Sequence, residues 1–189
     1  RPARNWSARR RSVGVIMSVN NSLYCDPISK FGTEAQKEEW LKPFATGQKL
    51  GCFGLTEPQA GSDAAAQLTV AVKKGDGYVI NGSKNWITNG GSASTYLVMA
   101  QTDAAKGHKG INCIIVEKGM PGFVVGAKED KLGIRGSDTH TLMFQDVKVP
   151  KANLLPNKSG LGAPMGCLDS ARYGIAWGTL GVAMECYDT

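Results

Sequence analysis

The chain has 189 residues, of which 42% are hydrophobic and 20% charged, and its formal net charge is +6. This composition is typical of a globular protein that is long enough to bury a core, and no apolar run is long enough to span a bilayer. Much of the positive charge comes from arginines in the first eleven residues, so the rest of the chain is nearly neutral and has no electrostatic footprint for a nucleic acid.

Residues 1–12 are rich in arginine and contain no acidic residue. Such a composition fits a transit peptide or a basic interaction tail. Residues 12–48 then have a helical pattern, in which Asp26-Pro27 marks a break between two helices. The second of these helices, at 33–44, begins with Thr33 as N-cap and has Gln36 three residues later, as in a capping box.

From residue 51 to residue 150 the pattern changes to short β-rich runs separated by Gly, Asp and Asn. Short strands at this spacing predict an antiparallel sandwich or barrel. No glycine-rich dinucleotide fingerprint follows a first strand, which disfavours a Rossmann fold. The predicted strands are residues 67–73, 77–81, 95–101, 111–116 and 140–144.

Two polar stretches interrupt this region. Residues 51–63 form a short apolar strand and then a loop, in which Pro58 fixes one backbone angle and Gly61 permits conformations closed to other residues. Such a loop can present backbone N–H groups and the Ser62 hydroxyl to an anion such as a pyrophosphate, although a plain turn also fits its composition. The second stretch, residues 81–89, places Trp86 near the Thr88 hydroxyl, a combination that suits a flat heteroaromatic ring.

The chain leaves the β-rich region through residues 147–156, and a helix is predicted from near Gly166 to Met184. The five cysteines are widely spaced and include no Cys-x-x-Cys, which favours reduced thiols over a disulfide scaffold or a zinc site. His108 lies in a predicted turn and His140 in a predicted strand, so neither is a candidate ligand or base. The sequence therefore predicts no metal site.

Phe53-Gly-Leu-Thr-Glu-Pro58 and Gly61-Ser-Asp63, followed by Trp86-Ile-Thr-Asn89, resemble the pair of flavin-binding motifs of the acyl-CoA dehydrogenases. Residues 18–24 and 131–137 resemble the short-chain (butyryl) members, and residues 166–178 are similar to the glutaryl-CoA members. The resemblance covers about residues 13–189.

This resemblance implies an α+β fold, with an antiparallel β-sandwich or barrel domain flanked by helical segments. Residues 1–48 would be the end of an N-terminal helical domain, 49–155 the middle β domain, and 156–189 the first helix of a C-terminal helical bundle. Val13 would then lie inside a family helix, so we interpret residues 1–12 as an artefact without function.

The resemblance further implies an FAD oxidoreductase that carries out α,β-dehydrogenation of a short-chain acyl-CoA and passes electrons to an electron-transferring flavoprotein. Ser62, Asp169 and Arg172 would contact the substrate. Three of the implied site residues also have a purely structural alternative. Thr56 would only end a strand, Trp86 would be a core aromatic, and Arg172 would form an ion pair inside a helix bundle. The residues implied in cofactor binding are Phe53, Leu55, Thr56, Gly61, Ser62, Trp86, Ile87 and Thr88.

The catalytic base of most members is a glutamate far toward the C-terminus, at a position beyond Thr189. A minority carry it one residue before the arginine of the last helix, which is Ala171 here. The resemblance thus assigns no base within these residues, and the isolated chain is expected to be inactive. Gly14 stands where glutaryl members have an arginine for the distal carboxylate, which favours a short, uncharged acyl group.

Two other functions stay open. One is an acyl-CoA oxidase or a flavin monooxygenase of the same fold, and the other is a truncated flavin-binding or assembly module without catalysis. The resemblance also implies a homo-oligomer, a tetramer at full length, located in a bacterial cytoplasm or a mitochondrial matrix. No nucleic acid partner and no membrane span are predicted.

Overall fold

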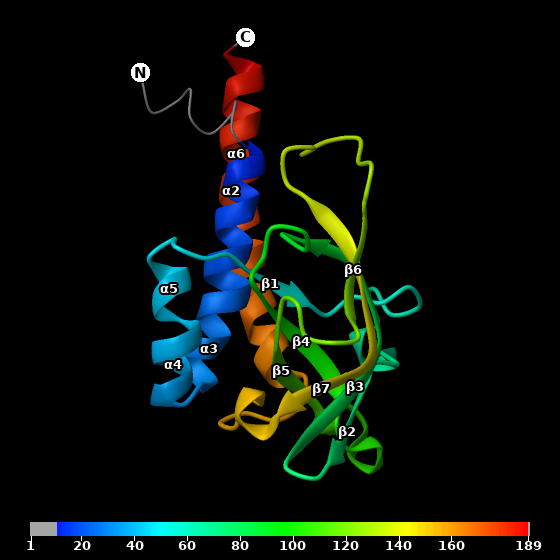
Figure 1. The fold of residues 1–189 in the computed structure, drawn as a ribbon. Coiled ribbons are helices and arrows are strands. Elements are labelled where there is room, and N and C mark those ends of the chain that lie inside the picture. Colours follow the sequence, from blue (N-terminus) through cyan, green and yellow to red (C-terminus); the bar gives the residue numbers. More distant parts are fainter. Residues whose placement is uncertain (1–10, 189) are drawn as a thin grey trace.

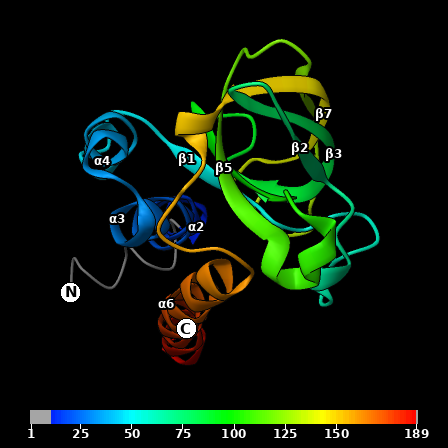
Figure 2. The same ribbon diagram turned by 90° about the horizontal axis from the view of Figure 1, so that it is seen from below.

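The computed structural model describes residues 11–188, in which a group of helices packs beside a curled sheet (Figure 1). The arginine-rich stretch that we interpret as an artefact lies almost entirely outside these residues. The view from below in Figure 2 separates the helices on one side from the strands that curl on the other. The long α6 (Gly162–Tyr187) runs beside α2 (Arg11–Ser18) and extends with it past the sheet.

The sheet has seven strands in the order β1-β4-β2-β3-β7-β6, with β5 paired to β4. Antiparallel pairing joins β2 to β3, β3 to β7, β6 to β7 and β4 to β5, whereas β4 runs parallel to β1 and β2. The strands are β1 (Gly51–Gly54), β2 (Val70–Lys74), β3 (Gly77–Thr88), β4 (Thr95–Gln101), β5 (Ile111–Glu117), β6 (Phe123–Lys128) and β7 (Thr139–Pro150).

The sheet differs from the sequence expectation in three respects. β4 pairs in parallel with both β1 and β2, so the sheet is mixed and the expectation of a purely antiparallel sheet is wrong at these two pairings. The strands β3 and β7 are both longer than predicted, and β2 begins at Val70 and not at residue 67. The sequence also missed β6, because its residues are mostly exposed or half-buried and its apolar run, residues 123–125, is short.

The continuously apolar β4 is explained by its place between two cores. Tyr96 and Val98 belong to the core inside the curled sheet, whereas Leu97 and Met99 belong to the core that the sheet shares with the helices. Successive side chains of a strand point to opposite faces, so a strand with a core on both faces has no polar alternation.

The N-terminal helices form one nearly continuous rod. It consists of α2, a π-helical segment η1 (Val19–Cys25) and α3 (Asp26–Phe31), and it ends at Gly32. The expected break at Asp26-Pro27 is therefore wrong. Proline lacks an N–H and clashes with the carbonyl four residues before it, and the wider π-turn accommodates this within the helix: Asp26 donates from its backbone N–H to the carbonyl of Asn21.

Two short helices follow, α4 (Glu34–Trp40) and α5 (Lys42–Ala45). The capping box at Thr33 is confirmed, since the Gln36 N–H donates to the Thr33 hydroxyl and the Thr33 N–H donates to the Gln36 side chain. Short 3-10 segments lie at Ala64–Ala66, Ala104–Gly110 and Lys151–Asn153. None of the helices within residues 11–188 combines the length and apolar character that crossing a membrane requires.

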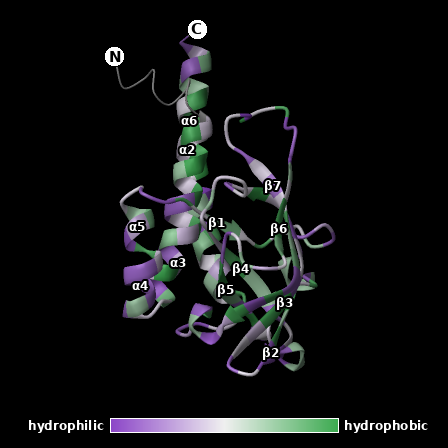
Figure 3. Ribbon diagram, in the orientation of Figure 1, coloured by the Kyte–Doolittle hydropathy of each residue, from purple (hydrophilic) through white to green (hydrophobic). Residues whose placement is uncertain are grey.

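Large apolar side chains are exposed along α6. Figure 3 colours the ribbon by hydropathy, and the part of α6 that extends past the sheet includes hydrophobic turns. They are Tyr173, Ile175, Trp177, Leu180, Met184 and Tyr187. A helix that is apolar on several faces is typically surrounded by other elements.

The contact between Gly51 and Tyr24 fixes the helical rod to the first strand. Tyr24 is fully buried, and a Cβ added at Gly51 would lie 2.1 Å from the Cγ of Tyr24. We expect Gly51→Ala to lower the free energy of unfolding by about 1–3 kcal/mol, because overpacking forces a rigid ring to move. Urea unfolding measures this loss.

A matched control is Gly166→Ala on α6, where an added Cβ meets nothing within 4 Å. This variant should be neutral or slightly more stable, because alanine favours a helix over glycine. Equal stability of the Gly51→Ala variant and the parent chain would contradict the packing described.

Candidate functional site

A bulge in β3 presents Trp86 to solvent. The register between β3 and β7 shifts between Lys84 and Ile87, and Trp86 has a positive φ of 59°. Its side chain is 59% exposed, whereas Ile87 beside it is 2% exposed. A bulky residue with positive φ is a conformational outlier, and such outliers cluster at functional sites. The exposed aromatic therefore marks this end of β3 as a candidate site.

The structure brings the two sequence motifs together at this bulge. The backbone N–H of Asn85 donates to the carbonyl of Thr56 at 2.8 Å, so the loop after β1 lies against the strand that carries Trp86. Asn89 donates from its side chain to the carbonyls of Ile16 on α2 and Gly51 on β1, at 3.2 and 3.3 Å. The loop, the strand and the first helix thus meet in one place.

The other predicted cofactor residues divide into two groups. The side chains of Phe53, Leu55 and Ile87 lie in the cores, so only their backbone is available to a ligand. Thr56 and Thr88 are half-buried, and Gly61 and Ser62 are exposed at the tip of the loop. The loop tip is also ordered by Asp63, whose carboxylate accepts a hydrogen bond from the Ala65 N–H.

A buried ion pair beneath this site was not predicted from the sequence. The Lys84 ammonium is fully buried and donates to the Leu55 carbonyl, to Glu57 and to Gln67, at 3.1, 2.7 and 2.8 Å. The sequence offered little indication of it, because a lysine and a glutamate that are far apart in sequence are usually two separate charges exposed to solvent. Both residues nevertheless lie inside the two motif stretches.

The charges of this pair respond to burial in different ways. Burial lowers the pKa of Lys84 to about 8, against the opposing effect of the Glu57 carboxylate. For Glu57, burial favours the neutral acid, but hydrogen bonds from Lys84 and Thr69 outweigh it and hold the pKa of the carboxyl below its usual value. Glu57 is therefore a paired carboxylate and is not available as a base.

The predicted substrate residues on α6 lie on an exposed part of that helix. Arg172 donates to the Asp169 carboxylate at 2.6 Å, and both side chains are mostly exposed. Ala171, beside them, is half-buried and carries no acid. One turn further on, Gly174 faces the Ser18 hydroxyl, which would lie 3.6 Å from a Cβ added there.

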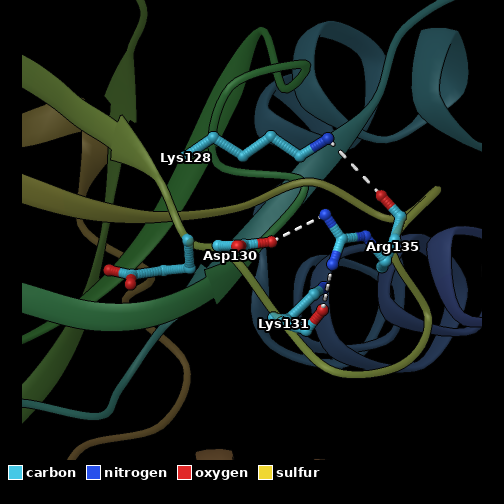
Figure 4. Close-up of a pocket in the computed structure, with 5 residues that line it drawn as sticks. Lys128, Asp130, Lys131 and Arg135 are labelled. Carbon is cyan, nitrogen blue, oxygen red and sulfur yellow. Dashed lines mark hydrogen bonds and ion pairs between the residues drawn. The ribbon is translucent and has the colours of Figure 1, made fainter.

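A separate pocket of about 210 Å³ lies in the loop between β6 and β7 (Figure 4). One ion pair lies in its lining: Arg135 pairs with Asp130 at 2.8 Å, and Lys128 donates to the carbonyl of Arg135. Lys131 donates to the carbonyl of Ser137 and the hydroxyl of Thr139. None of the predicted cofactor or substrate residues lines this pocket. These contacts within the loop indicate a structural role for it.

Metal ligation gains no support from the described part of the chain, where no group of three or more His, Cys, Asp or Glu residues could hold an ion. His140 contacts the Gly126 carbonyl through Nδ1 at 2.8 Å, and its Nε2 lies 3.5 Å from Asp138. The five cysteines are free, and only Cys186 among them is exposed.

Comparison with known proteins identifies two family domains. The middle domain of acyl-CoA dehydrogenases matches residues 52–147, and the N-terminal domain of acyl-CoA dehydrogenases matches residues 3–48. The second match begins at residue 3, whereas we began the motif resemblance at about residue 13, so it gives no support to the interpretation of residues 1–12 as an artefact.

Relatives of similar sequence are short-chain enzymes. The chain is 51% identical over 179 residues to the mitochondrial short-chain specific acyl-CoA dehydrogenase of Rattus norvegicus, a match that covers 94% of this chain and 43% of that protein. It is 53% identical over 173 residues to the short-chain specific enzyme of Megasphaera elsdenii, covering 90% of this chain and 45% of that protein. The chain thus spans less than half the length of these relatives.

Solved structures agree in fold. Butyryl-CoA dehydrogenase from Megasphaera elsdenii superimposes with a TM-score of 0.91 at 49% identity, over 96% of this chain and 48% of that one. A chain in the structure of the electron transferring flavoprotein of Acidaminococcus fermentans superimposes with a TM-score of 0.89 at 51% identity, and the match covers 92% of this chain and 46% of that one. A glutaryl-CoA dehydrogenase from Mycobacterium smegmatis in complex with FADH2 superimposes with a TM-score of 0.81 at 43% identity, and the match covers 87% of this chain and 41% of that one.

Proposed function

Because the chain belongs to the acyl-CoA dehydrogenase family, we propose that it forms the flavin-binding part of an FAD-dependent enzyme that dehydrogenates short-chain acyl-CoA thioesters. The observation that carries the proposal is the exposed Trp86 on a strained bulge, hydrogen-bonded through its neighbour Asn85 to the Thr56 loop. A flat ring system needs an aromatic surface with polar groups at its edge, and this arrangement supplies both.

The donor set of the site fits FAD. Trp86 would lie against the ring system, and the Thr88 hydroxyl would donate a hydrogen bond to it. The backbone of Leu55 and the hydroxyl of Thr56 would hold the pyrimidine edge, and Ser62 in the exposed loop tip would meet the pyrophosphate. FAD supplies the hydride acceptor of the reaction when it is bound.

The chain's own contribution is to bind and orient. A hydroxyl at Thr88 favours negative charge on the ring that it contacts, because a fixed donor needs no reorganisation when that charge develops. Arg172 carries a guanidinium suited to a phosphate of CoA. Its partner in the structure is the Asp169 carboxylate, so an exchange of partners on CoA binding is part of the proposal.

We expect Trp86→Ala to weaken FAD binding about tenfold or more, because stacking of a heteroaromatic ring on an aromatic side chain contributes on the order of 1–3 kcal/mol. Titration of the purified chain with FAD, followed by the change in flavin fluorescence, measures the affinity. Trp177→Ala is the matched control, since Trp177 is 60% exposed and Trp86 is 59% exposed. Unchanged affinity in the Trp86 variant would remove the assignment.

The substrate proposal rests on Gly14 and on the short-chain relatives. Gly14 lies on α2 with open space around it, and it offers no cation to a distal carboxylate. A chimera tests this, in which residues 1–189 replace the matching part of the Megasphaera elsdenii butyryl-CoA enzyme. We expect kcat/KM for butyryl-CoA to exceed that for glutaryl-CoA by at least about tenfold, because burying an unpaired carboxylate is costly.

Gly14→Arg in the same chimera is expected to narrow the difference between the two substrates. Equal or better use of glutaryl-CoA by the unsubstituted chimera would contradict the proposal. It would make the similarity of residues 166–178 to glutaryl-CoA members the better guide to substrate.

The proposed partner is an electron-transferring flavoprotein, which the similarity to a chain in such a structure supports. We also propose assembly into a homo-oligomer, a tetramer at full length, which the resemblance to the family implies. Named relatives include mitochondrial and bacterial enzymes, and we propose a mitochondrial matrix or a bacterial cytoplasm as the compartment.

Two alternatives have distinct outcomes. An oxidase or a flavin monooxygenase would react rapidly with oxygen once its flavin is reduced, whereas a dehydrogenase would not. A non-catalytic flavin-binding module would contain flavin but would not turn over butyryl-CoA. The chimera built from it would also fail to turn over butyryl-CoA with an artificial electron acceptor.

A further inference from the structure

The loop between β1 and β2 is closed at its neck by one carboxylate. Glu57 accepts hydrogen bonds from the backbone N–H groups of Leu68 and Thr69 at 2.6 and 3.0 Å, and from the Gln59 side chain at 2.7 Å. Residue 57 lies near the start of the loop, and residues 68 and 69 end it. This single side chain therefore joins both ends of the loop that carries Thr56 and Ser62.

The Lys84 ammonium connects this closed neck to β3. Its three N–H donors are matched by three acceptors, the Leu55 carbonyl, the Glu57 carboxylate and the Gln67 side chain. Two of these acceptors are at the start of the loop and one is near its end. Lys84 itself lies two residues before Trp86, at the edge of the bulge.

The same short segment of β3 thus holds both halves of the candidate site. Lys84 and Asn85 hold the loop, and Trp86 and Thr88 supply the face that the loop adjoins. A shift of the loop relative to β3 would separate Thr56 and Ser62 from Trp86 without altering any of the three side chains.

We propose that Lys84 is a positioning residue for the cofactor: through Glu57 and Gln67 it holds loop 55–69 against β3, so that both motifs face one flavin. The inference rests on the proposed function, since it concerns the same site. Lys84 is fully buried and Glu57 is 3% exposed, so neither charge is in contact with bulk water.

An apolar pair would serve packing alone at least as well. Replacing both members of a buried ion pair by neutral residues is often harmless to stability, whereas removing one leaves the other charge buried without a partner. An ammonium offers what an apolar residue does not, which is simultaneous hydrogen bonding to three separate points of the loop. Positioning and stability can therefore be separated by comparing a single with a double variant.

The first measurement is backbone amide hydrogen exchange on the full 189-residue chain without flavin. In the double variant Lys84→Met/Glu57→Gln, residues 57–69 are expected to exchange at least about tenfold faster than in the parent, while β4 and β5 keep their protection. Ile114→Val in the buried β5 is the control, because it weakens the core inside the curled sheet, which contains no residue of the loop. Unchanged exchange in the loop of the double variant would overturn the proposal.

The second measurement compares melting temperature and FAD affinity in the parent, the Lys84→Met variant and the double variant. The Lys84→Met variant should have a lower melting temperature and a weaker FAD affinity than the parent. The double variant should recover most of the melting temperature, because no charge is left alone, and still bind FAD about tenfold more weakly than the parent, because the loop must be ordered on binding. If Lys84 had a purely structural role, the double variant would recover the melting temperature and the FAD affinity together.

The outcomes separate this inference from the proposed function. If the parent and the double variant bind FAD equally well, the positioning role is wrong and the flavin site stands. If the parent chain itself does not bind FAD, the proposed function of this chain is contradicted and the positioning role falls with it.

Discussion

When the purified 189-residue chain is loaded with FAD and mixed anaerobically with butyryl-CoA, we expect flavin bleaching to be at least about 10²–10⁴-fold slower than in a short-chain acyl-CoA dehydrogenase, the factor that a positioned general base contributes. Removal of the α-proton needs a carboxylate within hydrogen-bond reach of the substrate carbon. The acids beside the candidate flavin residues do not meet this need: Glu57 is buried and paired with Lys84, and Asp63 lies in the exposed loop tip.

The position of the alternative base on α6 is equally informative. Ala171 stands directly before Arg172 and has no acidic group. Ala171→Glu in the 189-residue chain tests whether that position can supply the base, and partial recovery of bleaching would support the assignment. Rapid bleaching by the unsubstituted chain would mean that another carboxylate serves as base, and our account of these acids would be wrong.

Lys84→Met should have the largest effect on stability. We expect the free energy of unfolding at pH 7 to fall by about 3–5 kcal/mol, because the substitution leaves the Glu57 carboxylate buried without its ammonium partner. Urea unfolding at pH 7 measures the loss. Lys42→Met is the control, since the Lys42–Glu38 pair is exposed on both sides and should contribute little.

The loss should shrink as the pH falls. In the parent, the pKa of Glu57 is held below its ordinary value of 4.5, so its contribution to stability is present above that value and is lost as the pH falls through the folded-state pKa. In the Lys84→Met variant the buried acid has no cation, so protonation relieves it. Unfolding at pH 4 and pH 7 should therefore give a smaller difference between parent and variant at the lower pH. An equal difference would contradict the pairing.

The sequence predicted the strands that carry strong apolar signals. The run at β4 matches the structure end to end, and β5 does so to within one residue, because both strands are apolar and buried over most of their length. The edge strand β6 has no such run, and the parallel pairing of β1 with β4 joins segments more than forty residues apart. Local pattern carries no information about such pairings.

Parts of the candidate site were also visible in the sequence. Trp86 and Thr88 could be named because a motif places an aromatic and a hydroxyl together. The bulge that exposes Trp86 could not be predicted, since the positive φ at this tryptophan is imposed by the pairing of β3 with β7. The Lys84–Glu57 pair was missed for a related reason: burial of a charge depends on partners that only the folded chain brings together.

Titration of the isotopically labelled chain with FAD, followed by two-dimensional amide NMR, tests the central claim most directly. The account predicts saturable shifts concentrated in residues 53–62 and 84–89, where the loop and the bulge of β3 meet. Shifts concentrated instead in the loop between β6 and β7, or no saturable shifts at all, would contradict it.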